Sequence, residues 1–181
     1  MWNPARRIET AVVHAGSEPK VKGALVLPIF QSSTYLYSGQ SDYEDLKYIR
    51  LSNTPNHEAL GAKLAALEGG ESALVMASGM AAISTTLLSI LSAGDHLLIQ
   101  DCTYGGTRDL VSNDFPALGI QVDFIDPLDP NSWRDKLRPE TKAIFVESIS
   151  NPLMQIGDLS TAVEFAKKNG VVSLIDNTFA T

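Results

Sequence analysis

Residues 96–107 read HLLIQDCTYGGT, a short apolar run followed by a polar turn and two glycines. Because the run His96–Gln100 lacks polar alternation, it is typical of a strand that a parallel sheet buries on both faces. The two glycines allow a sharp turn, and Thr107–Phe115 beyond them has a helical pattern. This strand–turn–helix unit predicts an α/β fold.

The same alternation of strand and helix extends outward in both directions. We expect further strands over Ala73–Ala77, Gln121–Ile125, Ala143–Glu147 and Val171–Ile175. We expect further helices over His57–Glu68, Met80–Leu91, Asn131–Leu137 (with Asn131 as N-cap) and Leu159–Lys168. This order predicts a mostly parallel sheet with helices on both faces, within a domain that covers residues 57–181.

Residues 1–56 differ from the rest of the chain. They contain several prolines and show no steady period of 3.6 or 2, which predicts an irregular, extended N-terminal arm with one short helix, Asp42–Tyr48. Such an arm buries little of itself, so we expect it to lie on another surface.

Composition excludes several classes of function. The net charge of −7, without a Lys/Arg cluster, argues against binding to nucleic acid or to an acidic membrane surface. Cys102 is the chain's one cysteine, and the three histidines lack metal-ligand spacing, so we expect neither a disulfide nor a metal site. With no signal peptide and no long apolar run, we expect a cytoplasmic protein.

Three polar or glycine-rich segments follow expected strands, at the sheet edge where such folds bind ligands. Ser78-Gly79-Met80 opens a helix, whose free N–H groups would suit a phosphate, or Ser78 is simply an N-cap. Tyr104, before two glycines, either lies against a flat ring or is an exposed turn residue. Asp176 either pairs with a cationic ring nitrogen or caps the next turn.

Tyr48 and Arg50 form a fourth candidate, within the arm. A phenol and a guanidinium two residues apart can both reach one phosphate if the segment is extended. The alternative is a solvated surface arginine.

Short motifs in a fixed order run through nearly the whole chain. They are Thr10 with Val13-His14-Ala15-Gly16, then Pro28–Tyr35, Tyr48–Arg50, Leu67–Gly69, Ser78–Ile83, Gly94–His96, Tyr104–Thr107, Glu147-Ser148 with Asn151-Pro152, and Asp176–Phe179. Together they resemble the cystathionine/methionine-metabolism family of pyridoxal-phosphate enzymes, which includes cystathionine γ-synthase, γ-lyase and β-lyase, methionine γ-lyase and the homoserine-ester sulfhydrylases.

The resemblance implies a fold and a set of site residues. The fold would be that of the aspartate aminotransferase-like (fold type I) pyridoxal 5'-phosphate (PLP) enzymes. The implied roles are phosphate binding by Ser78, Gly79 and Met80, ring stacking by Tyr104, pairing of the ring nitrogen with Asp176, and places near the ring or substrate for Asn151 and Thr178. Tyr48 and Arg50 would reach the phosphate of a neighbouring subunit's cofactor, so the resemblance implies a homo-oligomer, a homotetramer with paired sites.

The activity implied is a PLP-dependent lyase or transferase of sulfur amino-acid metabolism. It would catalyse γ-elimination or γ-replacement on cystathionine, homocysteine or an O-acyl-homoserine, with an O-acetylhomoserine sulfhydrylase or a cystathionine β-lyase as alternatives. Gly106 stands where methionine γ-lyases carry a cysteine, which disfavours that activity.

Two departures from the family pattern stand out. Residues 50–56 read RLSNTPN, where the family has Arg-x-x-Asn-Pro-Thr. The family's Ser-x-Thr-Lys segment, with the lysine that forms the Schiff base, would follow Thr181. We therefore expect these 181 residues to be inactive alone and to be part of a roughly doubled chain.

Two other classes of function stay open. One is a truncated PLP-binding fragment without turnover. The other is a nucleotide-binding α/β domain, because Asp101 lies 22 residues after Gly79, although the G-x-G-x-x-G pattern is absent.

Overall fold

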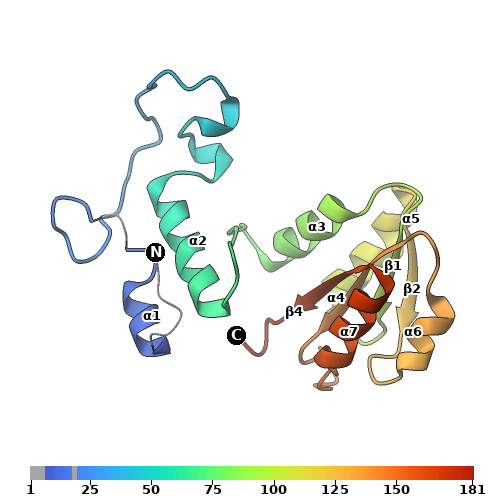
Figure 1. Cartoon of the computed structure of the whole chain (residues 1–181). Coiled ribbons are helices and arrows are strands. Elements are labelled where there is room, and N and C mark those ends of the chain that lie inside the picture. The colour runs from blue at the N-terminus through green and yellow to red at the C-terminus, as the bar shows by residue number, and fades with distance from the viewer. Residues whose placement is uncertain (1–6, 18–19) are drawn as a thin grey trace. The chain divides into compact units, whose positions relative to one another are not determined.

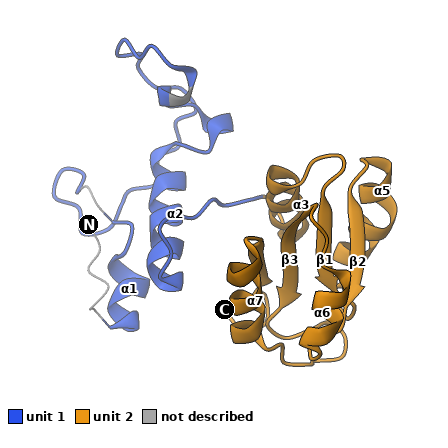
Figure 2. Ribbon diagram, turned by 45° about the vertical axis from the view of Figure 1, so that its right-hand side comes forward, with its two compact units in different colours: residues 1–76 blue, residues 77–181 orange. Residues whose placement is uncertain are grey.

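The computed structural model describes residues 7–17 and 20–181. The chain divides into two compact units, residues 1–76 and residues 77–181 (Figure 2). The first unit therefore contains helix α2 (Pro55–Glu68) in addition to the expected arm. Whether the arm reaches a neighbouring subunit is not a property of one chain, and the boundary at residue 56 stays a prediction.

The second unit is built on a four-stranded parallel sheet (Figure 1). Its strands are β1 (His96–Gln100), β2 (Gln121–Ile125), β3 (Thr141–Glu147) and β4 (Val172–Asp176), in the order β2-β1-β3-β4. All three pairings are parallel, as predicted. The expected strand over Ala73–Ala77 is wrong: the segment pairs with no strand of the described chain, and Leu74 is 65% exposed.

Helices cover both faces of this sheet. They are α3 (Gly79–Ile90), α4 (Gly105–Asp109), η3 (Leu110–Asp114, a π-helical stretch), α5 (Phe115–Ala117), α6 (Pro130–Lys136) and α7 (Leu159–Asn169). Successive side chains of a strand point to opposite faces. Leu97 and Ile99 of β1 accordingly belong to one buried cluster with Phe115, whereas Leu98 belongs to a second cluster with Trp133 and Phe165. The predicted two-sided burial is confirmed.

The helical run after β1 and the start of α6 differ from expectation, and other helix bounds shift by one or two residues. Thr107–Phe115 is part of a longer helical run over residues 105–117, interrupted by the π-helical stretch. Asn131 is not the N-cap of α6: the carboxylate of Asp129 accepts a hydrogen bond from the Asn131 N–H at 3.0 Å. Pro130 takes the first helical position, where a missing N–H costs nothing.

The first unit holds a helix that the sequence did not predict. Helix α1 (Ile8–His14) packs against α2. It buries Ala11, while Val12 and Val13 are both 53% exposed, so it shows no helical apolar period. In place of the expected helix Asp42–Tyr48 the structure has one short 3₁₀ turn, η1 (Tyr43–Asp45), and a second 3₁₀ turn, η2 (Ile49–Leu51), follows Tyr48.

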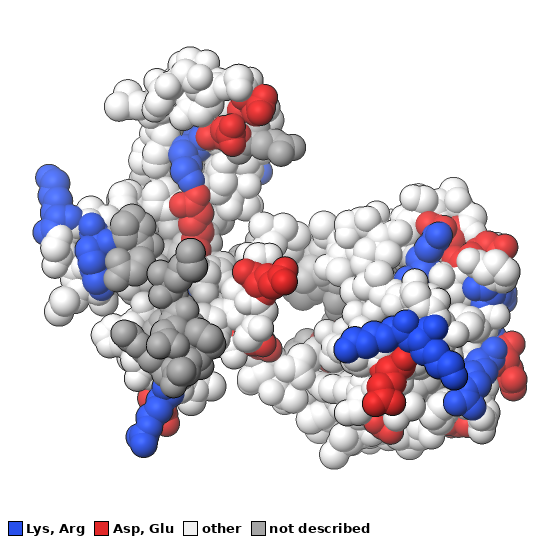
Figure 3. All heavy atoms as spheres, viewed as in Figure 1, with Lys and Arg blue, Asp and Glu red and all other residues white. Residues whose placement is uncertain are grey.

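Charges of both signs lie interleaved on the face of the second unit in Figure 3. Among the described residues, no helix is long and apolar enough to cross a lipid bilayer.

Candidate active site

The strand order creates a switch point between β1 and β3. After β1 the chain leads to β2 through α4, η3 and α5, whereas after β3 it leads to β4 through α7, in the opposite direction across the sheet. Where neighbouring strands connect in opposite directions, their carboxyl ends leave a crevice that commonly binds ligands. A cavity of about 440 Å³ lies there.

Every residue predicted for a site in the second unit lines this cavity. They are Ser78, Gly79, Met80, Tyr104, Asn151, Asp176 and Thr178. Ile83, Ile149 and Phe179 add apolar walls, and Glu147 adds a carboxylate. The sequence marked Glu147 only as part of a motif at a strand end and assigned it no role.

The N-terminus of α3 forms one wall. The Ser78 hydroxyl accepts a hydrogen bond from the Ala81 N–H at 3.0 Å, so Ser78 is the N-cap. No described residue accepts from the N–H groups of Gly79 or Met80, and a Cβ on Gly79 would meet no atom within 4 Å. The N-cap therefore leaves two donors and open space, which is the arrangement that binds a phosphate at a helix start.

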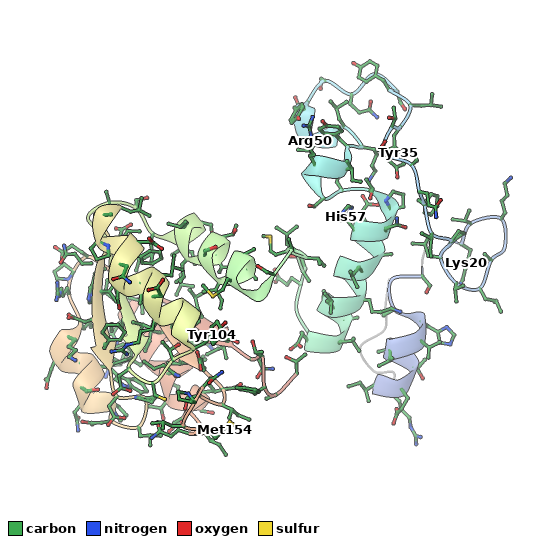
Figure 4. All side chains as sticks on the ribbon, turned by 180° about the vertical axis from the view of Figure 1, so that it is seen from behind. Lys20, Tyr35, Arg50, His57, Tyr104 and Met154 are labelled. Atoms are coloured by element: carbon green, nitrogen blue, oxygen red, sulfur yellow. The ribbon has the colours of Figure 1, made fainter. Side chains whose placement is uncertain are left out.

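Tyr104 lies at the start of α4 and lines a second side of the cavity (Figure 4). Its side chain is 45% exposed. The ring passes so close to Gly106 that a Cβ there would lie 2.8 Å from ring atom Cε1 and 3.1 Å from the sulfur of Met80. A residue larger than glycine at position 106 would therefore displace the ring.

Asp176, the last residue of β4, presents a carboxylate to the cavity. Its Oδ1 accepts hydrogen bonds from the Thr178 N–H at 3.0 Å and the Thr178 hydroxyl at 2.5 Å. Asp176 thus caps the following turn, which is the alternative role that the sequence left open for it. No described residue donates to Oδ2, which stays available to a cationic donor of a ligand.

Glu147, the last residue of β3, also lines the cavity. It is buried, and its carboxylate accepts three hydrogen bonds, from the Thr103 hydroxyl, the Tyr104 N–H and the Asn151 N–H. The donors come from the loops after both β1 and β3. One side chain therefore ties together the two connections that diverge at the switch point.

Tyr48 and Arg50 lie in the first unit and belong to a different hollow, of about 490 Å³. The Arg50 guanidinium carbon lies 4.6 Å from the centre of the Tyr48 ring, a cation–π distance. Asn53 accepts from the Tyr48 N–H at 2.9 Å and donates to the Leu46 carbonyl at 2.6 Å, which fixes this turn despite the departure from the family pattern.

His96 lies at the other end of β1, away from the cavity-lining loops. Its ring is fully buried, with Nδ1 2.8 Å from the Thr141 hydroxyl and Nε2 3.3 Å from the Asp123 carboxylate. Burial, helped by the charge of Arg138, lowers the pKa of His96 below its ordinary 6.5, against the opposing effect of Asp123. Among the described residues no cluster of His, Cys, Asp and Glu could hold a metal ion.

Comparison with known proteins then settles the family. The model of the Cys/Met metabolism PLP-dependent enzymes matches residues 9–181. The chain belongs to this family. The predicted resemblance is thereby confirmed, and with it pyridoxal phosphate as the cofactor of the family.

Individual relatives in the family carry different activities. The chain is 41% identical over 172 residues to a "probable cystathionine γ-synthase" of Herpetosiphon aurantiacus. The aligned residues cover 94% of this chain and 53% of that protein. It is 40% identical over 175 residues to a cystathionine β-lyase of Bacillus subtilis, covering 96% and 44%. The chain thus spans about half the length of the curated relatives that it matches.

A solved structure in the family confirms the fold. A Campylobacter jejuni protein described as an O-acetylhomoserine (thiol)-lyase superposes with a TM-score of 0.89 at 34% identity, over 97% of this chain and 45% of that one. It carries N'-pyridoxyl-lysine-5'-monophosphate. The α/β fold of the aspartate aminotransferase-like PLP enzymes, predicted from the sequence, is confirmed.

The cavity of this chain fits the family's cofactor. A phosphate requires donors such as the free N–H groups of Gly79 and Met80, and a flat ring requires an aromatic neighbour such as Tyr104. A protonated ring nitrogen requires a hydrogen-bond acceptor that no other donor occupies. Asp176 Oδ2 is such an acceptor, because no described residue donates to it. These groups line one cavity, of a volume typical of cofactor sites.

Proposed function

We propose that the protein is a PLP-dependent carbon–sulfur lyase or transferase of sulfur amino-acid metabolism, whose cofactor binds in the cavity at the ends of β1, β3 and β4. One observation carries the proposal: the α3 N-terminus, Tyr104 and Asp176, far apart in the sequence, line the same cavity in a chain that matches the family over residues 9–181.

Each wall has a distinct task in this proposal. The N–H groups of Gly79 and Met80 hold the phosphate at the positive end of α3. Tyr104 would stack on the cofactor ring and hold it in place. Asp176 Oδ2 accepts from the ring nitrogen and keeps it protonated, while Thr178 holds the other carboxylate oxygen in place. A protonated pyridine ring held in this way would supply an electron sink for negative charge that develops at the substrate's Cα.

The arm completes the site in an oligomer. We place the Tyr48 phenol and the Arg50 guanidinium on the phosphate of a neighbouring subunit's cofactor, which makes the functional form a homo-oligomer, a cytoplasmic homotetramer. The cation–π pair supports this role because it holds the guanidinium in one orientation.

For the substrate we propose cystathionine, homocysteine or an O-acyl-homoserine, with γ-elimination or γ-replacement as the reaction. The similar proteins include a cystathionine β-lyase and an O-acetylhomoserine (thiol)-lyase, so β-elimination and sulfhydrylation are the alternatives. Gly106 disfavours a methionine γ-lyase, which carries a cysteine at this position; in this chain a Cβ there would lie 2.8 Å from the Tyr104 ring.

A substrate panel tests the proposal. The product of the complete native gene, loaded with PLP, is given cystathionine, homocysteine, and O-acetyl- or O-succinyl-homoserine with and without a thiol, and oxo acid, ammonia and thioether are measured. We expect turnover of at least one γ-substituted substrate. Turnover of cystathionine by β-elimination alone would indicate a β-lyase, and PLP binding without turnover would support the non-catalytic alternative.

A further inference from the structure

We propose that Glu147 is the positioning residue of this site: its carboxylate fixes the backbone of Tyr104 and of Asn151, and thereby sets where the Tyr104 ring lies over the cavity. The proposal rests on the proposed function, since the ring matters only if it contacts a cofactor.

The contacts of Glu147 are directed at the two loops of the site. Oε1 accepts from the Thr103 hydroxyl at 2.6 Å and from the Tyr104 N–H at 2.7 Å, and Oε2 accepts from the Asn151 N–H at 3.0 Å. A carboxylate with one oxygen on each loop holds both at a fixed separation. The loops leave β1 and β3, the two strands that diverge at the switch point.

Burial of Glu147 makes the loss of any of these hydrogen bonds costly in free energy. Glu147 is 4% exposed, and no ion pair of the described residues includes it. Its carboxylate is therefore stabilised by hydrogen bonds from uncharged donors. A buried carboxylate is costly unless its oxygens are hydrogen-bonded. Each donor is therefore held in place by the free energy that its loss would cost.

A second buried side chain anchors the same structure. Gln100, 1% exposed at the end of β1, accepts from the Glu147 N–H at 2.7 Å and donates to the Cys102 carbonyl. The chain between β1 and α4 is thus tied at Cys102, Thr103 and Tyr104 to the ends of β1 and β3.

The ring of Tyr104 depends on this backbone. It is 45% exposed, and no described residue forms a hydrogen bond with its hydroxyl. Its position therefore follows from the backbone at Tyr104 and from the room that Gly106 leaves. A shift of the Tyr104 N–H away from Glu147 moves the ring relative to Asp176, which lines the same cavity.

The test uses the complete protein with Glu147→Gln, and with Glu164→Gln on the exposed face of α7 as the matched control. The side-chain carbonyl of the glutamine can still accept a hydrogen bond from one loop. Its NH2 group is a donor, so it cannot accept a hydrogen bond from the N–H of the other loop. In the apoprotein we expect amide hydrogen exchange at Tyr104 or Asn151 to accelerate roughly tenfold or more. In the holoprotein we expect the visible circular dichroism band of bound PLP to lose amplitude, with PLP dissociation constant raised about tenfold. The control should change neither.

Thr103→Val serves if the glutamine variant does not fold. It removes one donor and keeps the carboxylate, so faster exchange at the Tyr104 amide and a weaker dichroism band are expected, both smaller than for Glu147→Gln. Wild-type exchange rates and an unchanged band in whichever variant folds would overturn the proposal. Failure of the wild type to bind PLP would instead refute the proposed function, while the exchange measurement on the apoprotein would still decide whether Glu147 holds the loops.

Discussion

Glu147 and Asp176 are register partners on the neighbouring parallel strands β3 and β4, and both side chains line the cavity. Partners in a parallel ladder project from the same face of the sheet. Their surroundings nevertheless differ. Glu147 is buried and accepts three hydrogen bonds from its own chain, whereas Asp176 offers one oxygen with no donor among the described residues. One carboxylate holds the site together and the other is open to a ligand.

Replacement of Asp176 by asparagine should weaken the cofactor's hold on the site. A neutral amide cannot keep a ring nitrogen protonated, and a charge-assisted hydrogen bond contributes about 1.5–3 kcal/mol. We expect the PLP dissociation constant, measured by titration of the apoprotein, to rise about 10- to 100-fold, and turnover to fall at least as much. Asp135→Asn, at an exposed position of α6, is the control. Equal affinity in both variants would contradict the role of Asp176.

A methyl group at Gly106 should act through the ring of Tyr104. Because the added Cβ would lie 2.8 Å from that ring, Gly106→Ala should alter the absorption spectrum of bound PLP. Tyr104→Ala should raise the PLP dissociation constant about 3- to 10-fold through lost stacking. The double variant should then resemble Tyr104→Ala, since the methyl group has no ring to displace. Additive effects of the two substitutions would show that Gly106 acts by another route.

His96 should make folding stability sensitive to acid. Its pKa is lowered in the folded protein, so below pH 6.5 the unfolded chain binds a proton that the folded chain does not. The contribution of neutral His96 is therefore complete above this pH and is lost as the pH falls, by at most about 1.4 kcal/mol per pH unit. Asp123, Arg138 and Glu140 also act on the ring.

Urea unfolding at about pH 8 and about pH 5.5 measures this effect. Wild type should lose more stability between the two pH values than His96→Gln, whose amide does not titrate. Parallel losses would mean that other groups cause the acid sensitivity.

Mixed oligomers test the arm. If Arg50 serves a neighbouring subunit's cofactor, Arg50→Ala and Asp176→Asn place both defects in the same site of a mixed dimer and leave its other site intact. Each variant alone should be nearly inactive, and refolding of an equal mixture should restore about a quarter of wild-type activity, because half of the dimers then hold one intact site of two. No recovery, with mixed dimers shown by mass spectrometry, would place Arg50 in its own subunit's site.

The parallel sheet could be predicted because its signal is local. In β1, Leu97, Leu98 and Ile99 are all fully buried, two against one helical layer and one against the other, which requires an uninterrupted apolar run. The cavity residues could be predicted for a related reason: the carboxyl ends of parallel strands share one edge, so residues just after each strand gather there.

The features that were missed depend on contacts between distant residues. Helix α1 packs through small residues such as Ala11, which leave no apolar period in the sequence. An apolar run such as Ala73–Ala77 becomes a strand only when a neighbour pairs with it. Glu147 binds Thr103, 44 residues away, and nothing in either local sequence indicates that partner.

The most direct test of the account is the intact mass of the native gene product, before and after borohydride reduction. Borohydride fixes PLP to the lysine with which it forms a Schiff base. The account predicts that the purified chain gains the mass of one reduced pyridoxyl phosphate group, carried on a lysine outside residues 1–181. A chain whose mass does not change on reduction, in the presence of saturating PLP, would contradict the proposed catalytic function.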